Sequence, residues 1–174
     1  MSAQRNVVLV GFMGTGKTTV GMALAGKLDL VFVDMDHVIE ERQGKPISRI
    51  FAEQGEPVFR SLERQLTREL AGREGLVIGT GGGIVLNPEN IGDFALTGLV
   101  VCLMARPEVI LKRLEHDAKR PLLAGGDKMQ KITGILDARR PLYEAIPDRI
   151  DTSDLTADAV VDRIVTLYGA RKAP

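Results

Sequence analysis

Short runs of β-branched and other apolar residues alternate along the chain with longer segments in which apolar positions recur at helical spacing. The runs predict five strands, at Asn6–Val10, Val31–Val33, Leu76–Ile78, Gly98–Met104 and Arg149–Ile150. Strands that alternate with helices in this way form a parallel sheet covered by helices. We therefore predict an α/β fold around a central five-stranded parallel sheet.

Several helix starts are marked by residues that cap free backbone amides or fix the first turn. Asn87-Pro88, Pro107 and Thr156 are residues of this kind, and each precedes or opens a segment with helical spacing. The helices that they begin would lie between or after the last predicted strands. These residues therefore support the helix predictions.

Two segments depart from simple alternation of strand and helix. Residues 36–73 are mostly helical in pattern, with a break at residues 55–57, and predict a helical insertion between the second and third strands. Residues 120–131 are polar, contain Gly125-Gly126, and predict a lid loop. No repeat or linker divides the rest, so residues 1–174 are expected to form a single domain.

Composition and charge narrow the classes of function. Lysine and arginine total 23, as do aspartate and glutamate, so no net field favours nucleic acid or an anionic membrane. Cys102 lies in an apolar run and is expected to be buried, and one cysteine forms no internal disulfide. No stretch of eighteen apolar residues occurs. These features predict a cytoplasmic protein.

The segment Gly11–Thr18 reads GFMGTGKT and matches the phosphate-binding pattern G-x-x-x-x-G-K-[ST]. It follows a predicted strand and precedes a predicted helix, which is the context that the pattern requires. Its glycines let backbone amides turn toward phosphate oxygens, Lys17 adds positive charge, and the Thr18 hydroxyl is a magnesium ligand. The alternative is a glycine turn that binds nothing.

Asp34 and Asp36 follow the second predicted strand, at the edge where open α/β sheets bind ligands. Asp34-Met-Asp36 is expected to end this strand, and strand alternation then projects both carboxylates to one side. A kinase acting on an alcohol needs one carboxylate near the metal and another near the hydroxyl. The alternative is that Asp36 only caps the helix predicted at residues 36–42. His37 is interpreted as a surface residue.

Glycines and arginines add further candidates. Gly81, Gly82 and Gly83 follow the third predicted strand and allow close backbone approach to a ligand, although a loose turn is the alternative. Arg60 lies on a predicted helix, whereas Arg120 and Arg139 lie in or beyond the predicted lid. Arginine forks suit carboxylates and phosphates, but surface arginines are common.

Taken together, these motifs resemble the shikimate kinase family over nearly the whole chain, from Val7 to Tyr168. The matching patterns are G-x-x-G-x-G-K-T at 11–18, D-x-D at 34–36, F-R-x-x-E at 59–63, G-G-G at 81–83, R-P-L-L at 120–123 and R-x-P-L-Y at 139–143. The resemblance implies a three-layer P-loop fold like that of nucleoside monophosphate kinases. It also implies transfer of the γ-phosphate of ATP to shikimate with Mg²⁺.

The resemblance implies a role for each candidate residue. Asp36, Lys17 and Arg120 would be catalytic, Thr18 would ligate the metal, and Asp34 would hold it through water. The helical insertion at residues 36–73 would bind the substrate. ATP would contact Gly14, Thr15, Gly16, Lys17, Thr18, Thr19, Arg113 and Arg120. Shikimate would contact Asp36, Arg60, Gly81, Gly82, Gly83 and Arg139, with Glu63 steadying Arg60. The expected enzyme is a monomer that binds shikimate and ATP but neither nucleic acid nor membrane.

Two alternative functions stay open at this point. Another small-molecule P-loop kinase, for gluconate or a nucleoside monophosphate, would explain the nucleotide motif but not the arginines and glycines together. A nucleotide-dependent switch would leave Asp36 without a purpose, and the chain contains no Asn-Lys-x-Asp motif for guanine.

Overall fold

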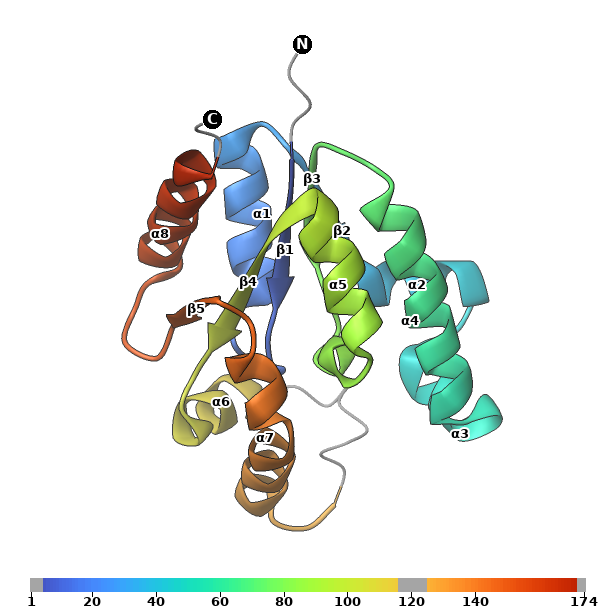
Figure 1. The fold of residues 1–174 in the computed structure, drawn as a ribbon. Helices are drawn as coiled ribbons and strands as arrows, with labels where there is room; N and C mark the ends of the chain where they lie inside the picture. The colour runs from blue at the N-terminus through green and yellow to red at the C-terminus, as the bar shows by residue number, and fades with distance from the viewer. Residues whose placement is uncertain (1–4, 116–124, 172–174) are drawn as a thin grey trace.

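The fold is built on one sheet of five parallel strands in the order β2-β3-β1-β4-β5 (Figure 1). The strands are β1 (Asn6–Val10), β2 (Val31–Asp34), β3 (Leu76–Gly79), β4 (Gly98–Met104) and β5 (Asp148–Asp151). All five predicted strands are confirmed, each to within one residue at either end. The central strand β1 lies between β3 and β4, so the loop that follows it leaves from the middle of the sheet.

Eight α-helices and one 3₁₀ helix are present in the described residues. They are α1 (Lys17–Leu28), α2 (Met35–Gln43), α3 (Ile47–Gln54), α4 (Glu56–Ala71), η1 (Ile84–Leu86), α5 (Pro88–Thr97), α6 (Pro107–Leu114), α7 (Lys128–Glu144) and α8 (Ala157–Ala170). The predicted caps are confirmed, because Asn87 and Thr156 accept backbone hydrogen bonds and Pro107 opens α6. The helical segment predicted at residues 36–73 corresponds to α2, α3 and α4.

The sheet has an apolar core on each face because its strand residues alternate between the two sides. Val8, Val10 and Cys102 pack toward a cluster that includes residues of α2, α4, α5, α6 and α7. Val7 and Leu9 pack toward α1 and α8 on the opposite face. Helices on both faces make the three layers that the fold prediction requires (Figure 1).

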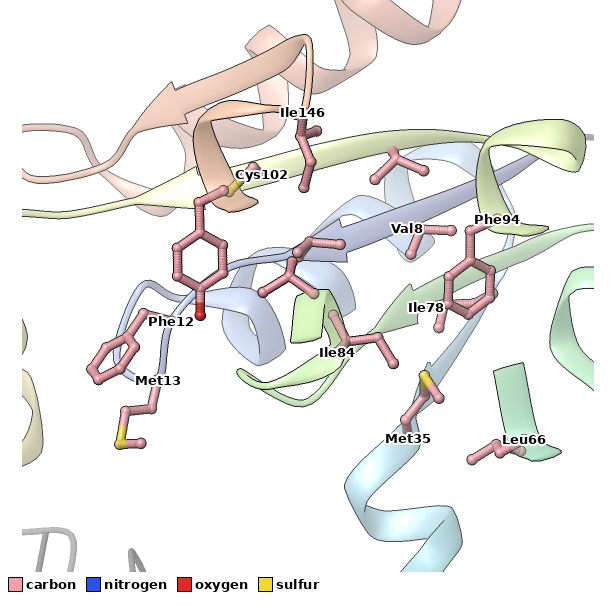
Figure 2. Close-up of a cluster of buried hydrophobic side chains, with 14 of the residues drawn as sticks. Val8, Phe12, Met13, Met35, Leu66, Ile78, Ile84, Phe94, Cys102 and Ile146 are labelled. Atoms are coloured by element: carbon pink, nitrogen blue, oxygen red, sulfur yellow. The ribbon is translucent and has the colours of Figure 1, made fainter. Parts of the chain in front are cut away.

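Figure 2 shows how the first of these cores reaches the candidate site. Phe12 and Met13, which belong to the loop after β1, lie in the same cluster as Ile84, Met35 and Phe94. All five side chains are buried. The loop that carries the phosphate-binding motif is therefore anchored in the hydrophobic core by its own second and third residues.

The structure is a computed structural model that describes residues 5–115 and 125–171. The predicted lid, 120–131, lies partly outside these residues, and its last part differs from the prediction because Lys128 already begins α7 with Asp127 as its cap. Cys102 is buried as predicted, and burial raises the pKa of its thiol to about 12. Within the two described ranges, no helix is long and apolar enough to cross a membrane.

Candidate active site

The loop between β1 and α1 has the conformation of a phosphate-binding loop. Gly11, Gly14 and Gly16 have positive φ angles of 146°, 75° and 98°. A Cβ on Gly11 would lie 2.2 Å from the carbonyl oxygen of Leu103, so only glycine fits there. The loop ends at the N-terminus of α1, where unpaired amides and the helix dipole favour an anion.

The side chains of Lys17 and Thr15 stabilise this loop through hydrogen bonds to its carbonyl oxygens. The Lys17 ammonium donates to the carbonyl oxygens of Gly11 and Phe12 at 2.7 and 2.9 Å. The Thr15 hydroxyl is buried and donates to the Phe12 carbonyl at 2.8 Å. Thr15 therefore offers a ligand its backbone amide, while its side chain serves the loop itself.

Thr18 and Asp34 meet beside the loop. The Thr18 hydroxyl donates to Asp34 Oδ2 over 3.3 Å, and both residues line the same pocket. The two oxygens have nearly the spacing of neighbouring oxygen ligands around Mg²⁺, which is about 3 Å for metal–oxygen distances of 2.0–2.1 Å. In the described part of the chain, no cluster of three or more Asp, Glu, His or Cys residues forms a protein-only metal site.

The structure corrects the geometry expected for the two aspartates. Asp34 ends β2 and is itself the cap of α2, since its Oδ1 accepts from the His37 amide at 3.2 Å. Asp36 lies in the first turn of α2, so strand alternation does not set its direction and the cap interpretation of Asp36 is wrong. Both carboxylates nevertheless line one pocket, of about 170 Å³. His37 is exposed, as interpreted.

The pocket combines residues from the ends of several elements. It is lined by Met13, Gly14, Gly16, Lys17, Thr18, Thr19, Asp34, Asp36, Gly79, Thr80, Gly82 and Leu114. The P-loop forms one side, and the aspartates with the loop after β3 form another. Of the residues predicted for ATP and metal, the structure thus brings most to one cavity at the carboxyl ends of β1, β2 and β3.

The three glycines after β3 run close to charged side chains. A Cβ on Gly81 would lie 2.9 Å from Glu63 Oε1 and 3.0 Å from Asp36 Oδ1, while one on Gly83 would lie 2.4 Å from Arg60 Nη2. Larger residues would push these groups away. The loose-turn alternative is wrong, because Gly81 makes room for Asp36 and Glu63 and Gly83 makes room for Arg60.

Arg60 and Arg139 lie around the buried carboxylate of Glu63. Arg60 Nη1 donates to Glu63 Oε2 at 2.7 Å, and Glu63 is only 1% exposed. Burial raises the pKa of Glu63, and the charges of Arg60 and Arg139 oppose that rise. Arg139 comes from α7 and is itself only 8% exposed. The fold therefore brings together two arginines that are 79 positions apart in sequence.

Tyr143 fixes the glycine loop from α7. Its hydroxyl donates to the Gly82 carbonyl oxygen at 2.6 Å, and its ring is buried. Burial raises the pKa of Tyr143 to about 12, against the influence of Arg139, so the hydroxyl keeps the hydrogen that it donates. Tyr143 stands in the matched R-x-P-L-Y motif, but sequence reasoning assigned it no role.

Arg113 contacts the P-loop from the side on which β5 ends. Its Nη1 donates to the Gly14 carbonyl oxygen at 3.1 Å and to the Thr152 hydroxyl at 3.1 Å, and its Nη2 donates to the Thr152 carbonyl oxygen at 3.0 Å. Its guanidinium therefore joins the phosphate loop to the segment after β5. Arg120, predicted to reach the transferred phosphate, lies outside the described residues.

Comparisons with known proteins agree with this geometry. The family profile described as shikimate kinase matches residues 13–168. A shikimate kinase from Pelotomaculum thermopropionicum is 46% identical over 161 residues, covering 92% of this chain and 94% of that protein. The solved shikimate kinase from Acinetobacter baumannii in complex with shikimate has a TM-score of 0.92 at 38% identity, and covers 98% of this chain and 96% of that one.

The chain belongs to the shikimate kinase family. A second solved shikimate kinase, from Aquifex aeolicus, is 32% identical with a TM-score of 0.82 and covers 95% of this chain and 98% of its own. Shikimate kinases are ATP-dependent phosphotransferases, so the family decides against a nucleotide-dependent switch. The predicted α/β fold with a parallel sheet of the P-loop kinase type is likewise confirmed.

Sequence reasoning about this shikimate kinase missed two contacts of the site. Glu56 contacts Arg60 through Nε at 3.2 Å and Nη2 at 3.0 Å. The i,i+4 spacing of Glu56 and Arg60 would have been a signal for that pair, but the helix break predicted at residues 55–57 hid it, because α4 in fact begins at Glu56. Thr152 gave no such signal, because it bonds to Arg113 and to the Thr15 carbonyl oxygen across long sequence separations.

Proposed function

We propose that this chain transfers the γ-phosphate of ATP to the 3-hydroxyl of shikimate, giving shikimate 3-phosphate and ADP for aromatic amino-acid biosynthesis. The observation that carries the proposal is one site in which a phosphate-binding loop, Asp36 and the Arg60–Glu63 pair converge on the glycine loop. The loop would bind ATP, Asp36 would meet the attacking hydroxyl, and Arg60 would pair with the ligand carboxylate.

ATP would bind along the P-loop and the start of α1. Backbone amides of Gly14, Thr15 and Gly16 and the Thr18 and Thr19 region would surround its phosphates, as helix N-termini do for anions. Lys17 would exchange its carbonyl contacts for the β and γ phosphates. Arg113, beside the loop and Thr152, would pack against adenine.

Magnesium would be held where Thr18 and Asp34 meet. The Thr18 hydroxyl can give a lone pair to the metal while it keeps its hydrogen and donates it to the Asp34 carboxylate, so the observed Thr18–Asp34 contact fits this role. Bound Mg²⁺ neutralises charge on the β and γ phosphates. Arg120 would add a positive charge at the transferred group, where charge is spread in the transition state.

Shikimate would bind on the other side of Asp36. We assign its carboxylate to Arg60 and Arg139, because guanidinium groups pair with carboxylates through two parallel hydrogen bonds. Gly81, Gly82 and Gly83 would lie against the ring. Asp36 would orient the attacking hydroxyl and accept its proton, since its carboxylate lines the same cavity as Lys17.

The remaining assignments concern the whole chain. Residues 1–174 would act as a single monomeric domain in the cytoplasm, with the α2–α4 segment as the substrate-binding insertion. The lid role would belong to the part of residues 120–131 that precedes α7, and that part would close over ATP and shikimate and exclude water.

A coupled assay of ADP release tests the proposal. We expect turnover with shikimate, very little with its methyl ester, and none with gluconate or nucleoside monophosphates. Arg60→Ala and Arg139→Ala should each raise the KM for shikimate at least about tenfold while changing the KM for ATP much less. Equal turnover of acid and ester would refute the carboxylate grip, and turnover of gluconate alone would refute the substrate.

A further inference from the structure

Arg60 binds two carboxylates of its own chain at once. Its side edge, formed by Nε and Nη2, donates to Glu56 Oε1 at 3.2 and 3.0 Å. Its other terminal nitrogen, Nη1, donates to Glu63 Oε2 at 2.7 Å. The edge that would pair best with the carboxylate of an incoming ligand is therefore occupied by Glu56.

The two glutamates differ in what they contribute to Arg60. Glu63 is buried at 1% exposure, and its short bond to Nη1 holds the guanidinium from the buried side. Glu56 is 50% exposed, and an exposed i,i+4 ion pair adds little stability. The Glu56 contact is therefore weak as a support but well placed as a competitor.

Charges near the guanidinium also disfavour an added anion. Arg60 already pairs with both Glu56 and Glu63, so two carboxylates contact this one guanidinium. A ligand carboxylate adds one more negative charge. Of the two protein carboxylates, Glu56 alone is half exposed, so it can turn away into water at the lower cost in desolvation.

Glu56 also has a source of stabilisation that does not depend on Arg60. It is the first residue of α4, after Gly55 with a φ of 84°, and a carboxylate in the first helical turn is stabilised by the free amides and the helix dipole. Glu56 therefore keeps this stabilisation when its side chain leaves Arg60.

We propose that Glu56 is a specificity-determining residue that competes with the ligand carboxylate for the side edge of Arg60 and so lowers affinity for shikimate. The proposal rests on the assignment of Arg60 to the shikimate carboxylate. In the ligand-free enzyme Glu56 takes the place of that carboxylate. Only a ligand whose carboxylate also pairs with Arg139 and whose hydroxyl also donates to Asp36 displaces it. Anions without the ring hydroxyl gain too little to do so.

The test compares Glu56→Gln with Glu53→Gln by calorimetric titration of shikimate. Glutamine removes the charge at residue 56 but is close in size, so the helix start is kept. Glu53 lies three residues earlier and pairs with Lys45 and Arg49, so Glu53→Gln makes the same change in net charge away from Arg60. We expect Glu56→Gln to tighten shikimate binding by about three- to tenfold, the scale of one exposed charge contact, and Glu53→Gln to leave it within about twofold.

Two further measurements separate this inference from the carboxylate grip itself. The gain from Glu56→Gln should largely disappear with the methyl ester and in the Arg60→Ala background, because the competition acts through that arginine. Arg60→Ala that binds shikimate normally would overturn the grip. If Arg60→Ala weakens shikimate binding as expected but Glu56→Gln leaves the affinity unchanged or lowers it, only the proposed competition is refuted. Glu56 would then support Arg60 rather than compete with the ligand.

Discussion

At the scale of single residues, the carboxylates of Asp36 and Glu63 lie close together but differ in their exposure to the pocket. Asp36 lines the open pocket together with Lys17. Glu63 is buried behind the glycine loop, against Arg60. Both lie about 3 Å from the point where a Gly81 Cβ would stand. Because only Asp36 faces the pocket, it is the carboxylate that can meet a substrate hydroxyl.

Asp36→Asn is expected to keep the fold and ATP binding while turnover falls by about two or more powers of ten, the usual scale for a positioned base. The amide retains the shape of the carboxyl group but has no useful basicity. Turnover in the coupled assay, with ATP affinity by calorimetry, checks this. His37→Ala is the matched control and should stay within about twofold, since His37 is exposed. Near-normal turnover of Asp36→Asn would end its assignment as the base.

Glu63 predicts a dependence of stability on pH. Its folded-state pKa is raised by burial above the usual 4.5, so the folded protein holds this proton more tightly than the unfolded chain does. Its contribution to stability is then greatest below pH 4.5 and declines as the pH rises through the folded-state pKa. The free energy of unfolding of the wild type minus that of Glu63→Gln should therefore fall between pH 4.5 and 8.

Urea unfolding over that pH range measures the difference, and Glu53→Gln provides the control. Hydrogen bonds from Lys45 and Arg49 lower the pKa of exposed Glu53, so its contribution is kept above pH 4.5 and is lost only as the pH falls. The corresponding difference for Glu53 should show no decline toward pH 8. A Glu63 difference that grows with pH would mean that pairing with Arg60 outweighs burial.

At the scale of elements, the segment from β3 to η1 decides where the charged groups stand. Thr80 ties its start to β1, through an amide and a hydroxyl that both reach the Leu9 carbonyl oxygen. Tyr143 holds its middle at Gly82. The loop is thus fixed at two points, and its glycines present bare backbone to the side chains of α2 and α4.

Gly83→Ala should separate binding from stability. Gly83 has a φ of −94°, so alanine causes no backbone strain, but its Cβ would meet the Arg60 guanidinium at 2.4 to 2.7 Å. The flexible end of Arg60 can shift, so we expect a loss of only about 1 kcal/mol in the free energy of unfolding. The displaced fork should raise the KM for shikimate by about ten- to a hundredfold and leave the KM for ATP nearly unchanged.

Gly92→Ala is the matched control for this change. Gly92 lies in α5, and no heavy atom lies within 4 Å of the point that a Cβ would occupy there. Alanine should therefore stabilise the helix by up to about 1 kcal/mol and leave both KM values unchanged. Steady-state kinetics and urea unfolding of the two variants make the comparison. An unchanged KM for shikimate in Gly83→Ala would show that the position of Arg60 does not limit binding.

At the scale of the whole molecule, strand order brings distant segments to one edge of the sheet. β1 lies between β3 and β4, so the P-loop has the glycine loop on one side and the ends of β4 and β5 on the other. Thr152, after β5, connects these ends. Its hydroxyl lies 3.0 Å from the Met104 carbonyl oxygen and 3.2 Å from that of Thr15 and accepts from Arg113.

Thr152→Val should weaken this connection without changing side-chain volume. Thr152 is 3% exposed, and loss of its buried hydroxyl should lower the free energy of unfolding by about 1 to 3 kcal/mol. Because Arg113 loses a partner, the KM for ATP should rise several-fold while that for shikimate stays nearly constant, and Thr152→Ser should restore both stability and ATP binding. Equal changes in both KM values would make Thr152 a purely structural residue.

The sequence by itself determined the elements and the chemistry near the nucleotide. Strands were evident because buried parallel strands need continuous apolar runs, and the P-loop because its glycines, Lys17 and Thr18 are contiguous in the chain. Caps such as Asn87 and Thr156 were equally local. In each case the physical requirement acts within a few residues, so the pattern alone states it.

Only the tertiary structure decided which side chains meet. The approach of Arg139 to Glu63, the contact of Tyr143 with Gly82, and the connections of Thr152 join segments that packing brings together. The direction of Asp36 was set by α2 beginning at Met35, where strand alternation would have given a different one. Such contacts depend on strand order and helix packing, which follow from the fold as a whole rather than from any local run of residues.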